Sequence, residues 1–164
     1  MDIDEFDEST FASLHRQAAD AGFDFTTMAE LGDTAEHHRA LYELNKTCSS
    51  DIPGRGEFYT YTDYVAQRID VPGYNPNGVI LAVHDSRWAG MTATSLHPAK
   101  GVAFSEMTGV LRSHRGRGLS LALKLHAIQF VQAAGYRWLV AFHHPGNAAA
   151  IGMNRRLGFV DYGR

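Results

Sequence analysis

The 164 residues suffice for one domain with one hydrophobic core, and contents of 45% hydrophobic and 20% charged residues match soluble globular proteins and argue against disorder. No apolar run approaches the roughly 18 residues of a membrane span, and the acidic start MDIDEFDE resembles neither a signal nor a transit peptide. The single Cys48 excludes an internal disulfide. Together these features indicate a cytoplasmic protein. The net charge of −3 combines −10 over residues 1–111 (7 Lys/Arg, 17 Asp/Glu) with +7 over residues 112–164 (8 Lys/Arg, 1 Asp), so the C-terminal third suits an anionic ligand unless folding mixes the two sets of charges.

Hydrophobic spacing predicts helices and one strand in the N-terminal part of the chain. Phe11, Leu14 and Ala18 fall on one face of a helix, and Gly22 is expected to end it. The sequence DTAE at residues 33–36 has the spacing of a capping box, which predicts the start of a second helix. The expected elements are a helix over residues 7–21, a strand over 23–28, a helix from 33 to 48 and a short helix over 62–69, with loops over 48–58 and 70–78.

The C-terminal part alternates between strands and helices. The crossover from one strand through a long helix to the next strand requires a parallel pair, whereas the preceding turns HDSR and HPAKG make antiparallel pairs. We therefore expect an α/β domain of three layers, with a mixed, mostly antiparallel sheet and helices on both faces. The expected elements are strands over residues 79–83, 88–96 and 102–111, a helix over 118–134, a strand buried on both faces over 136–142, a helix over 147–157 and a last strand from 158.

The loop between the strand over residues 102–111 and the following helix has the strongest chemical signal. Gly116 and Gly118, framed by Arg115 and Arg117, expose successive backbone N–H groups at the positive end of the helix dipole. Such a helix start holds phosphate or pyrophosphate, because glycines allow close approach and arginines add charge. The alternative is a tight turn without a ligand. Neither the Walker pattern GxxxxGK nor the Rossmann pattern GxGxxG fits the sequence.

Two motifs resemble those of one enzyme family. The sequence RGRGLS at residues 115–120 opens a helix after a strand that ends VLR, and it resembles the acetyl-CoA signature R/Q-x-x-G-x-G/A of the GNAT N-acetyltransferase superfamily. The sequence NAAAIGMNRRLGF at residues 147–159 resembles that family's Asn-led helix and closing Leu-Gly-Phe, and the spacing between the two motifs agrees. The resemblance implies a single GNAT acyltransferase domain over residues 23–164, with a splayed parallel strand pair, preceded by a helical extension over residues 1–22.

The resemblance also implies that acetyl-CoA is the co-substrate, and the CoA phosphates would explain the basic C-terminal third. Backbone N–H groups from Arg115 to Ser120 would hold the pyrophosphate, and the strand end around Val110 would pair with the pantetheine arm. A backbone N–H near Val110 or Leu111 would stabilise the oxyanion of the reaction, and Asn147 would bind near the pantetheine. The implied CoA-binding residues are Thr108, Val110, Leu111, Arg115, Gly116, Arg117, Gly118, Leu119, Ser120, Asn147 and Asn154.

The sequence departs from the family pattern at three places. Ser120 stands where Gly or Ala is usual, and Asn154 stands where many members have a tyrosine that acts as general acid. Because an amide donates no proton in acid catalysis at neutral pH, the acid is absent, is water or comes from elsewhere in the chain. The chain stops at Arg164, where members usually have one more strand, so we expect an open sheet edge or a partner that covers it, such as a second copy in a homodimer.

Two side chains are candidates for the base that deprotonates the incoming ammonium group. Glu106 has the same strand parity as Thr108 and Val110, so all three are expected to share a face of the sheet, although an exposed strand glutamate is the alternative. His144 follows a strand end, where ligands collect, and histidine titrates near pH 7, but a plain loop residue is the simpler interpretation. The spacing of the nine histidines predicts no metal site.

The expected function is transfer of an acetyl or other small acyl group from CoA to the primary amine of a small molecule, by direct attack in a ternary complex. The alternatives are a CoA-binding regulatory module without turnover and an enzyme that acetylates a protein N-terminus or lysine. Neither nucleic acid nor a membrane is an expected partner, because residues 115–120 form a focused loop and not a basic stripe with aromatics. Tyr59, Tyr61 and Tyr64 would line the acceptor pocket, whereas core packing is expected for Trp88.

Overall fold

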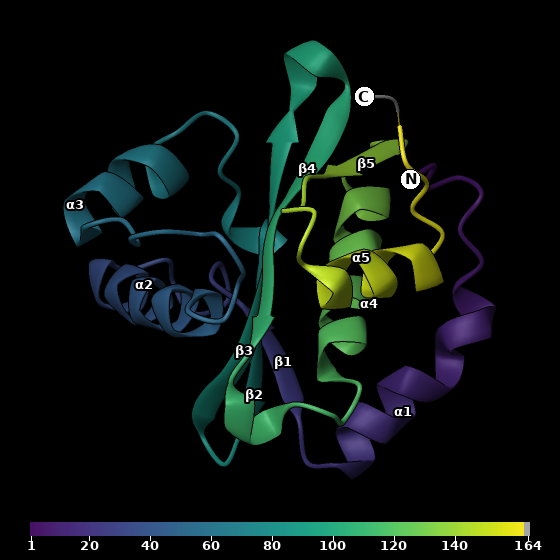
Figure 1. Ribbon diagram of the computed structural model, residues 1–164, viewed down its shortest axis with the longest axis horizontal. Coiled ribbons are helices and arrows are strands. Elements are labelled where there is room, and N and C mark those ends of the chain that lie inside the picture. Colours follow the sequence, from purple (N-terminus) through teal and green to yellow (C-terminus); the bar gives the residue numbers. More distant parts are fainter. Residues whose placement is uncertain (163–164) are drawn as a thin grey trace.

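The computed structural model describes residues 1–162, and its middle layer is a five-stranded sheet (Figure 1). The strands lie in the order β1-β2-β3-β4-β5, so each strand pairs with its neighbour in the sequence. All pairs are antiparallel except β4–β5, which is parallel, as the helical crossover predicts. The strands are β1 (Asp24–Thr27), β2 (Val79–His84), β3 (Arg87–His97), β4 (Val102–Val110) and β5 (Trp138–Ala141).

Helices cover both faces of the sheet, which confirms the predicted three-layer α/β class. Figure 1 shows α2 and α3 on one face and α1, α4 and α5 on the other. None of the helices in residues 1–162 has the length and apolar character needed to cross a bilayer. The helices are α1 (Ala12–Asp20), α2 (Ala35–Ser49), α3 (Tyr61–Tyr64, continued by a π-helical turn over Val65–Ile69), α4 (Leu119–Ala133) and α5 (Ala148–Arg156).

Strand β2 shows how the sheet is buried on both sides. Val79 and Leu81 pack in the apolar layer that contains α2, and Ile80 and Ala82 pack in the layer that contains α4. All four are at most 5% exposed, which agrees with the unbroken apolar run over residues 79–83 of the sequence. The buried residues of the first layer are Met28, Leu41, Leu44, Cys48, Val79, Leu81 and Met91, and those of the second are Ala18, Phe23, Ile80, Ala82, Ala89, Val110, Leu119, Ala122 and Leu123.

Side-chain caps fix where α2 and α5 begin. Thr34 Oγ1 accepts a hydrogen bond from the His37 N–H, so α2 starts one residue later than a capping box headed by Asp33 would place it. Asn147 Oδ1 accepts a hydrogen bond from the Ala150 N–H at the start of α5. The start of α4 differs from both, because no side chain caps it.

The parallel pair β4–β5 separates soon after it begins. Val102–Ser105 of β4 pair with Trp138–Ala141 of β5, whereas β4 continues beside β3 as far as Val110. From Glu106 onward, one edge of β4 therefore has no strand neighbour within residues 1–162. This arrangement is the expected splayed pair, and it leaves backbone groups on that edge of β4 available to an extended ligand.

The interpretation of residues 136–142 as a strand buried on both faces is wrong. The strand is shorter, Trp138 is 43% exposed, and Phe142, directly after β5, is 83% exposed. Leu139 is fully buried and is the residue that β5 contributes to the core. Within β5, Leu139 thus faces the core and Trp138 faces solvent, so the strand is not covered on both faces.

The expectation of a last strand from residue 158 is also wrong, since no strand follows β5 within residues 1–162. Residues 1–3 lie along the outer edge of β5 instead. The Ile3 N–H donates to Arg137 O at 2.7 Å, and the Leu139 N–H donates to Met1 O at 3.1 Å. These bonds occupy edge groups of β5 with which a further strand would have paired.

The close approach of α2 to β4 gives a prediction for stability. A Cβ atom at Gly109 would lie 2.6 Å from Cys48 Cβ on α2, so Gly109→Ala is expected to lower the free energy of unfolding by about 1–3 kcal/mol. Gly152→Ala in α5 is the matched control, because a Cβ there meets no atom within 4 Å and alanine favours a helix by about 0.5–1 kcal/mol. Urea denaturation measures both changes, and undiminished stability of Gly109→Ala would contradict the packing.

Candidate functional site

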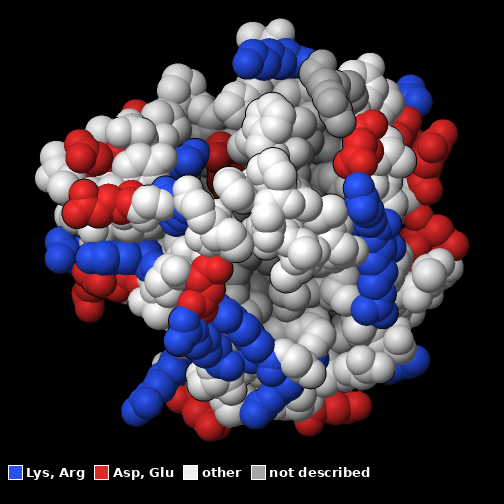
Figure 2. Space-filling model, in the orientation of Figure 1, with Lys and Arg blue, Asp and Glu red and all other residues white. Residues whose placement is uncertain are grey.

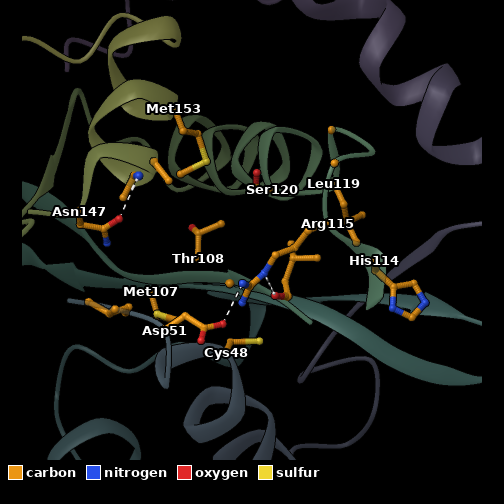
Figure 3. Close-up of a pocket in the computed structure, with 17 residues that line it drawn as sticks. Cys48, Asp51, Met107, Thr108, His114, Arg115, Leu119, Ser120, Asn147 and Met153 are labelled. Atoms are coloured by element: carbon orange, nitrogen blue, oxygen red, sulfur yellow. Dashed lines mark hydrogen bonds and ion pairs between the residues drawn. The ribbon is translucent and has the colours of Figure 1, made fainter. Parts of the chain in front are cut away.

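Two cavities meet at β4. The first, which we call the groove, has a volume of about 360 Å³ and follows the free edge of β4 (Figure 3). The second, which we call the side pocket, has a volume of about 370 Å³ and lies between the β3–β4 pair and the segments around α3. Met107 lines both, so the cavities adjoin at this residue. The groove is lined by Cys48, Asp51, Ile52, Met107, Thr108, Gly109, Val110, His114, Arg115, Gly116, Gly118, Leu119, Ser120, Asn147, Ala149, Ala150 and Met153.

The loop before α4 presents backbone N–H groups that nothing in residues 1–162 satisfies. Gly116 and Gly118 have φ values of +78° and +73°, which favour glycine, and Gly118 begins α4 without a side-chain cap. The first backbone bond of the helix runs from the Ala122 N–H to Gly118 O, and the N–H groups of residues 116–121 donate to no acceptor among the described residues. They lie at the positive end of the α4 dipole, where a Cβ on Gly116 would meet no atom within 4 Å. This arrangement suits a phosphate or diphosphate.

Cationic side chains gather beside this loop. Figure 2 shows Lys and Arg side chains over the connection from β4 to α4, next to a hollow in the surface. Arg115 Nε donates to Val110 O at 3.0 Å and its Nη1 donates to Asp51 Oδ2 at 2.8 Å, and Arg112 Nε donates to the same Asp51 oxygen at 2.8 Å. These guanidinium hydrogen bonds hold the pKa of the Asp51 carboxyl far below its usual range. Arg117 is exposed on the loop and lies outside the groove lining.

Strand β4 directs the backbone groups of Thr108 and Val110 toward its free edge. In an antiparallel pair, alternate residues point their N–H and C=O groups to the same side. The Leu111 N–H donates to Ala89 O on β3 at 2.9 Å, so Leu111 and Gly109 face β3, and the N–H groups of Thr108 and Val110 face the groove. The expectation that the Leu111 N–H helps to stabilise the oxyanion is therefore wrong, and Leu111 also lies outside the groove lining.

The start of α5 lies across the groove from β4. Asn147 lines the groove and caps α5 (Figure 3). Asn154 is 4% exposed and lies outside the groove lining, with its Nδ2 2.7 Å from His143 Nε2 and its buried Oδ1 without a partner in residues 1–162. Eight of the eleven residues predicted to bind CoA therefore line the groove, and the exceptions are Leu111, Arg117 and Asn154.

A β-bulge turns Glu106 to the opposite face of the sheet from Thr108. Consecutive residues of β3 pair with Ser105 and Met107, so Glu106 between them has no partner on β3. The extra residue shifts the alternation of side chains by one. The expectation that Glu106 shares a face with Thr108 and Val110 is wrong for this reason.

Glu106 lies in the side pocket with both carboxylate oxygens hydrogen-bonded. Its Oε2 accepts from Arg68 Nη1 at 2.6 Å, and its Oε1 accepts from Ser95 Oγ at 2.7 Å. Arg68 Nη2 also lies 3.4 Å from the Tyr59 hydroxyl. Because Met107 is the next residue in the chain, the carboxylate lies where the side pocket adjoins the groove. A cation holds it there, and an ammonium group could take the place of that cation.

The other predicted site residues are dispersed. His144 is exposed and lines neither cavity, and its Nδ1 accepts a backbone N–H two residues further along at 3.0 Å. Tyr59 and Tyr64 line the side pocket, whereas Tyr61 does not. Trp88 packs against the apolar layer that contains α2, as expected for a core residue.

The sequence analysis missed Lys124, which lies in α4. Its side chain is 2% exposed, its Nζ donates to Ser105 Oγ, and the Phe159 ring centroid lies 5.2 Å from Nζ. No carboxylate in residues 1–162 forms an ion pair with it, and burial lowers its pKa to about 8. A sequence signal was present, because Lys124 is the single charged residue in a helix that is apolar on nearly all sides. Arg68 had no such signal.

Comparison with known proteins identifies the family. Residues 38–159 match the model of the Acetyltransferase (GNAT) family. The chain belongs to the GNAT acetyltransferase family. Its groove, glycine loop and splayed strand pair are thus features of a GNAT domain.

Individual GNAT proteins match over most of this chain. It is 29% identical over 136 residues to the mycothiol acetyltransferase of Frankia casuarinae, covering 77% of this chain and 39% of that protein. It is 34% identical over 130 residues to the mycothiol acetyltransferase of Arthrobacter sp. strain FB24, covering 76% and 40%. The chain thus spans about two fifths of the length of these relatives. Among solved structures, the aminoglycoside N-acetyltransferase AAC(6')-Iy in complex with CoA shares the fold, with a TM-score of 0.63 at 19% identity over 87% of this chain and 90% of that chain.

The buried Lys124 gives a prediction for stability against pH. Its pKa falls from 10.5 to about 8 on folding, so between these values the unfolded chain binds more protons, and stability rises with pH. Lys124→Met is expected to raise the free energy of unfolding at pH 7 by up to about 3 kcal/mol, and the gain is expected to disappear by pH 10.5. Urea denaturation across this range measures the gain, with Lys100→Met on an exposed turn as control. A gain independent of pH would contradict burial of the ammonium form.

Proposed function

We propose that the protein transfers an acetyl group from acetyl-CoA to the primary amine of a small molecule. The observation that supports this most strongly is the row of N–H groups over residues 116–121, which have no acceptor within residues 1–162. Four residues of this segment, Gly116, Gly118, Leu119 and Ser120, line the same groove as the free edge of β4. A diphosphate joined to an extended arm with amide groups matches both features, and CoA has this combination. The names of the related enzymes, which refer to mycothiol and aminoglycosides, support a small-molecule acceptor.

The residues of the groove suit each part of CoA. The N–H groups of residues 116–121 are placed to hold the pyrophosphate, with the Arg115 guanidinium beside them. The free-edge N–H groups of Thr108 and Val110 are placed to bind the pantetheine arm in the manner of an added strand. Bound acetyl-CoA supplies the acetyl thioester. Of the two free-edge groups, the Thr108 N–H is nearer in the chain to Glu106, so we assign to it the stabilisation of negative charge on the thioester oxygen.

Glu106 is the proposed base. An ammonium group that takes the place of Arg68 at this carboxylate gives one proton to it, and Glu106 passes that proton to solvent. The amine nitrogen then bonds to the acetyl carbon while the bond from carbon to sulfur breaks. The nitrogen loses a second proton as the amide forms, and the departing thiolate takes up one proton, so one proton is released overall.

Direct transfer is favoured over an acyl-enzyme route. Cys48 is the thiol that lines the groove. Burial raises its pKa to about 11, so it stays protonated near neutral pH and is a poor nucleophile. We therefore assign the attack on the thioester to the amine itself, with both substrates bound together.

Gly118 tests the anion site. Gly118→Glu adds bulk and a negative charge to the loop that carries the N–H groups of residues 116–121, so it is expected to abolish CoA binding in titration calorimetry. Because Gly118 has a φ of +73°, any side chain strains the loop, and Gly118→Ala is the matched control that carries strain without charge. Gly118→Ala is expected to keep most of the affinity. If the affinity of Gly118→Glu for CoA were within a few-fold of the affinity of Gly118→Ala, the loop would not be the diphosphate site.

Glu106 tests the chemistry. Glu106→Gln is expected to lower kcat by roughly 100-fold or more and to shift the acidic limb of the kcat–pH profile to higher pH, because the amine must then lose its proton to solvent. The measurement is release of CoA thiol with a panel of primary amines, and Glu43→Gln on the exposed face of α2 is the control. Parent-like turnover and pH dependence would exclude Glu106 as the base. Binding of CoA by the parent protein without thiol release from any amine would instead identify a binding module.

A further inference from the structure

The side pocket has a charge that the proposed transfer alone does not explain. Arg55, Arg68 and Glu106 are the Lys, Arg, Asp or Glu residues that line it, so one carboxylate faces two guanidinium groups. The transfer chemistry uses only Glu106. An acceptor whose sole charge is its ammonium group would enter a pocket that already has an excess of positive charge.

The Arg68–Glu106 ion pair is complementary to a zwitterion. The two groups lie 2.6 Å apart, with side-chain exposures of 37% and 21%. When an ammonium group takes the Glu106 carboxylate, Arg68 loses its counter-charge in a half-buried position, which is unfavourable. An acceptor with its own carboxylate supplies Arg68 with a new partner, so one ion pair is replaced by two.

Arg55 is a second guanidinium group, and it has no anionic partner in the part of the chain that the structure describes. Within residues 1–162 its side chain forms no ion pair or hydrogen bond, and its Cζ lies 4.6 Å from the centroid of the Phe58 ring. Burial lowers the pKa of Arg55, which means that its charge is partly removed from water without a compensating anion. Guanidinium groups bind carboxylates in a two-point geometry. Arg55 and Arg68 line the same pocket, and the charge of Arg68 contributes to lowering the pKa of Arg55, so a carboxylate in this pocket has two guanidinium groups within reach of its charge.

We propose that the side pocket binds acceptors that have a carboxylate close to their primary amine. In this arrangement the ammonium group lies at Glu106, and the carboxylate lies at Arg68 and Arg55. A free amino acid and an amino-terminal acidic residue of a peptide share this chemistry. The inference rests on the proposed function, because it assigns the acceptor of that same reaction.

The remaining wall of the pocket suits an apolar substituent on such an acceptor. The Tyr64 hydroxyl accepts a hydrogen bond from Asn45 Nδ2 at 3.2 Å, and the Tyr74 hydroxyl donates to Asp33 Oδ1 at 2.7 Å. Both hydroxyls are thus engaged by protein groups, and the two rings join Ile69 and other apolar side chains in lining the pocket. A volume of about 370 Å³ accommodates a small amino acid.

Matched acceptors test this inference. γ-Aminobutyrate is compared with n-butylamine, and L-phenylalanine with L-phenylalaninamide. The third pair is two dipeptides with a free N-terminus and a C-terminal amide, one beginning with Glu and the other with Gln. In at least one pair we expect the acceptor with the carboxylate to have a kcat/KM at least about tenfold higher in the thiol-release assay. We also expect it to bind more tightly, in calorimetry, to protein saturated with CoA. The pair that responds distinguishes a free amino acid from a peptide end.

Arg55→Gln tests the contribution of the unpartnered guanidinium group. It is expected to reduce the preference for the carboxylate by about tenfold, which corresponds to the loss of one charge-assisted hydrogen bond. Arg16→Gln on the exposed face of α1 is the control, and it is expected to keep the preference of the parent. Because the preference is a ratio of two acceptors on one protein, a general loss of active protein does not change it.

The outcomes separate the two proposals. The inference would be overturned, with acetyl transfer left intact, if the neutral acceptor of every pair bound at least as tightly and reacted at least as fast as its partner with the carboxylate. An unchanged ratio of kcat/KM between the two acceptors in Arg55→Gln would overturn it as well. If the protein binds CoA but releases thiol with no acceptor, acetyl transfer is wrong. Calorimetry with CoA-saturated protein then still decides whether the side pocket prefers the carboxylate.

Discussion

The free edge of β4 is the feature on which the rest of the site depends. β5 pairs with β4 only over Val102–Ser105 and then ends, so the start of α5 and not a strand lies across from the remaining residues of β4. The N–H groups with which a longer β5 would have paired stay available at Thr108 and Val110, whereas Val110 O accepts from Arg115 Nε. The same separation leaves a groove that Gly116, Gly118, Leu119 and Ser120 at the start of α4 also line, and Figure 3 shows Leu119 and Ser120 there. One short parallel pairing thus brings two sets of backbone donors into the same cavity.

A single inserted residue connects this groove with the side pocket. At the bulge in β4, Glu106 and Met107 both face α2 and α3, and Thr108 faces the other side. Without the bulge, Glu106 and Thr108 would share a face. Either the carboxylate would then lie under α4 among apolar side chains, where its charge is costly, or Thr108 would point away from α4 and α5. The bulge avoids both outcomes and keeps the carboxylate one residue from the groove.

The limits of the sequence analysis follow from the range of the interactions involved. The glycine loop at residues 115–118 and the cap at Asn147 depend on groups a few residues apart, so a local pattern was sufficient to identify them. The environment of Glu106 was not predictable in this way, because its partner Arg68 lies 38 residues away and the bulge arises from pairing with β3. The covering of β5 by residues 1–3 likewise joins segments from opposite parts of the chain.

The basic character of residues 112–164 is partly cancelled in the fold, and this determines how the groove can hold an anion. The ion pairs that cancel it join three of its arginines to acids from residues 1–111, namely Arg112 and Arg115 with Asp51 and Arg137 with Asp2. The Lys124 side chain on α4 is buried in the protein and forms no ion pair with an acid in residues 1–162. A diphosphate must therefore compete with Asp51 for Arg115, whereas the N–H groups of residues 116–121 have no internal competitor. In the proposed site, affinity for the anion would therefore depend first on the backbone, and the conformation that two glycines allow would matter more than the number of arginines nearby.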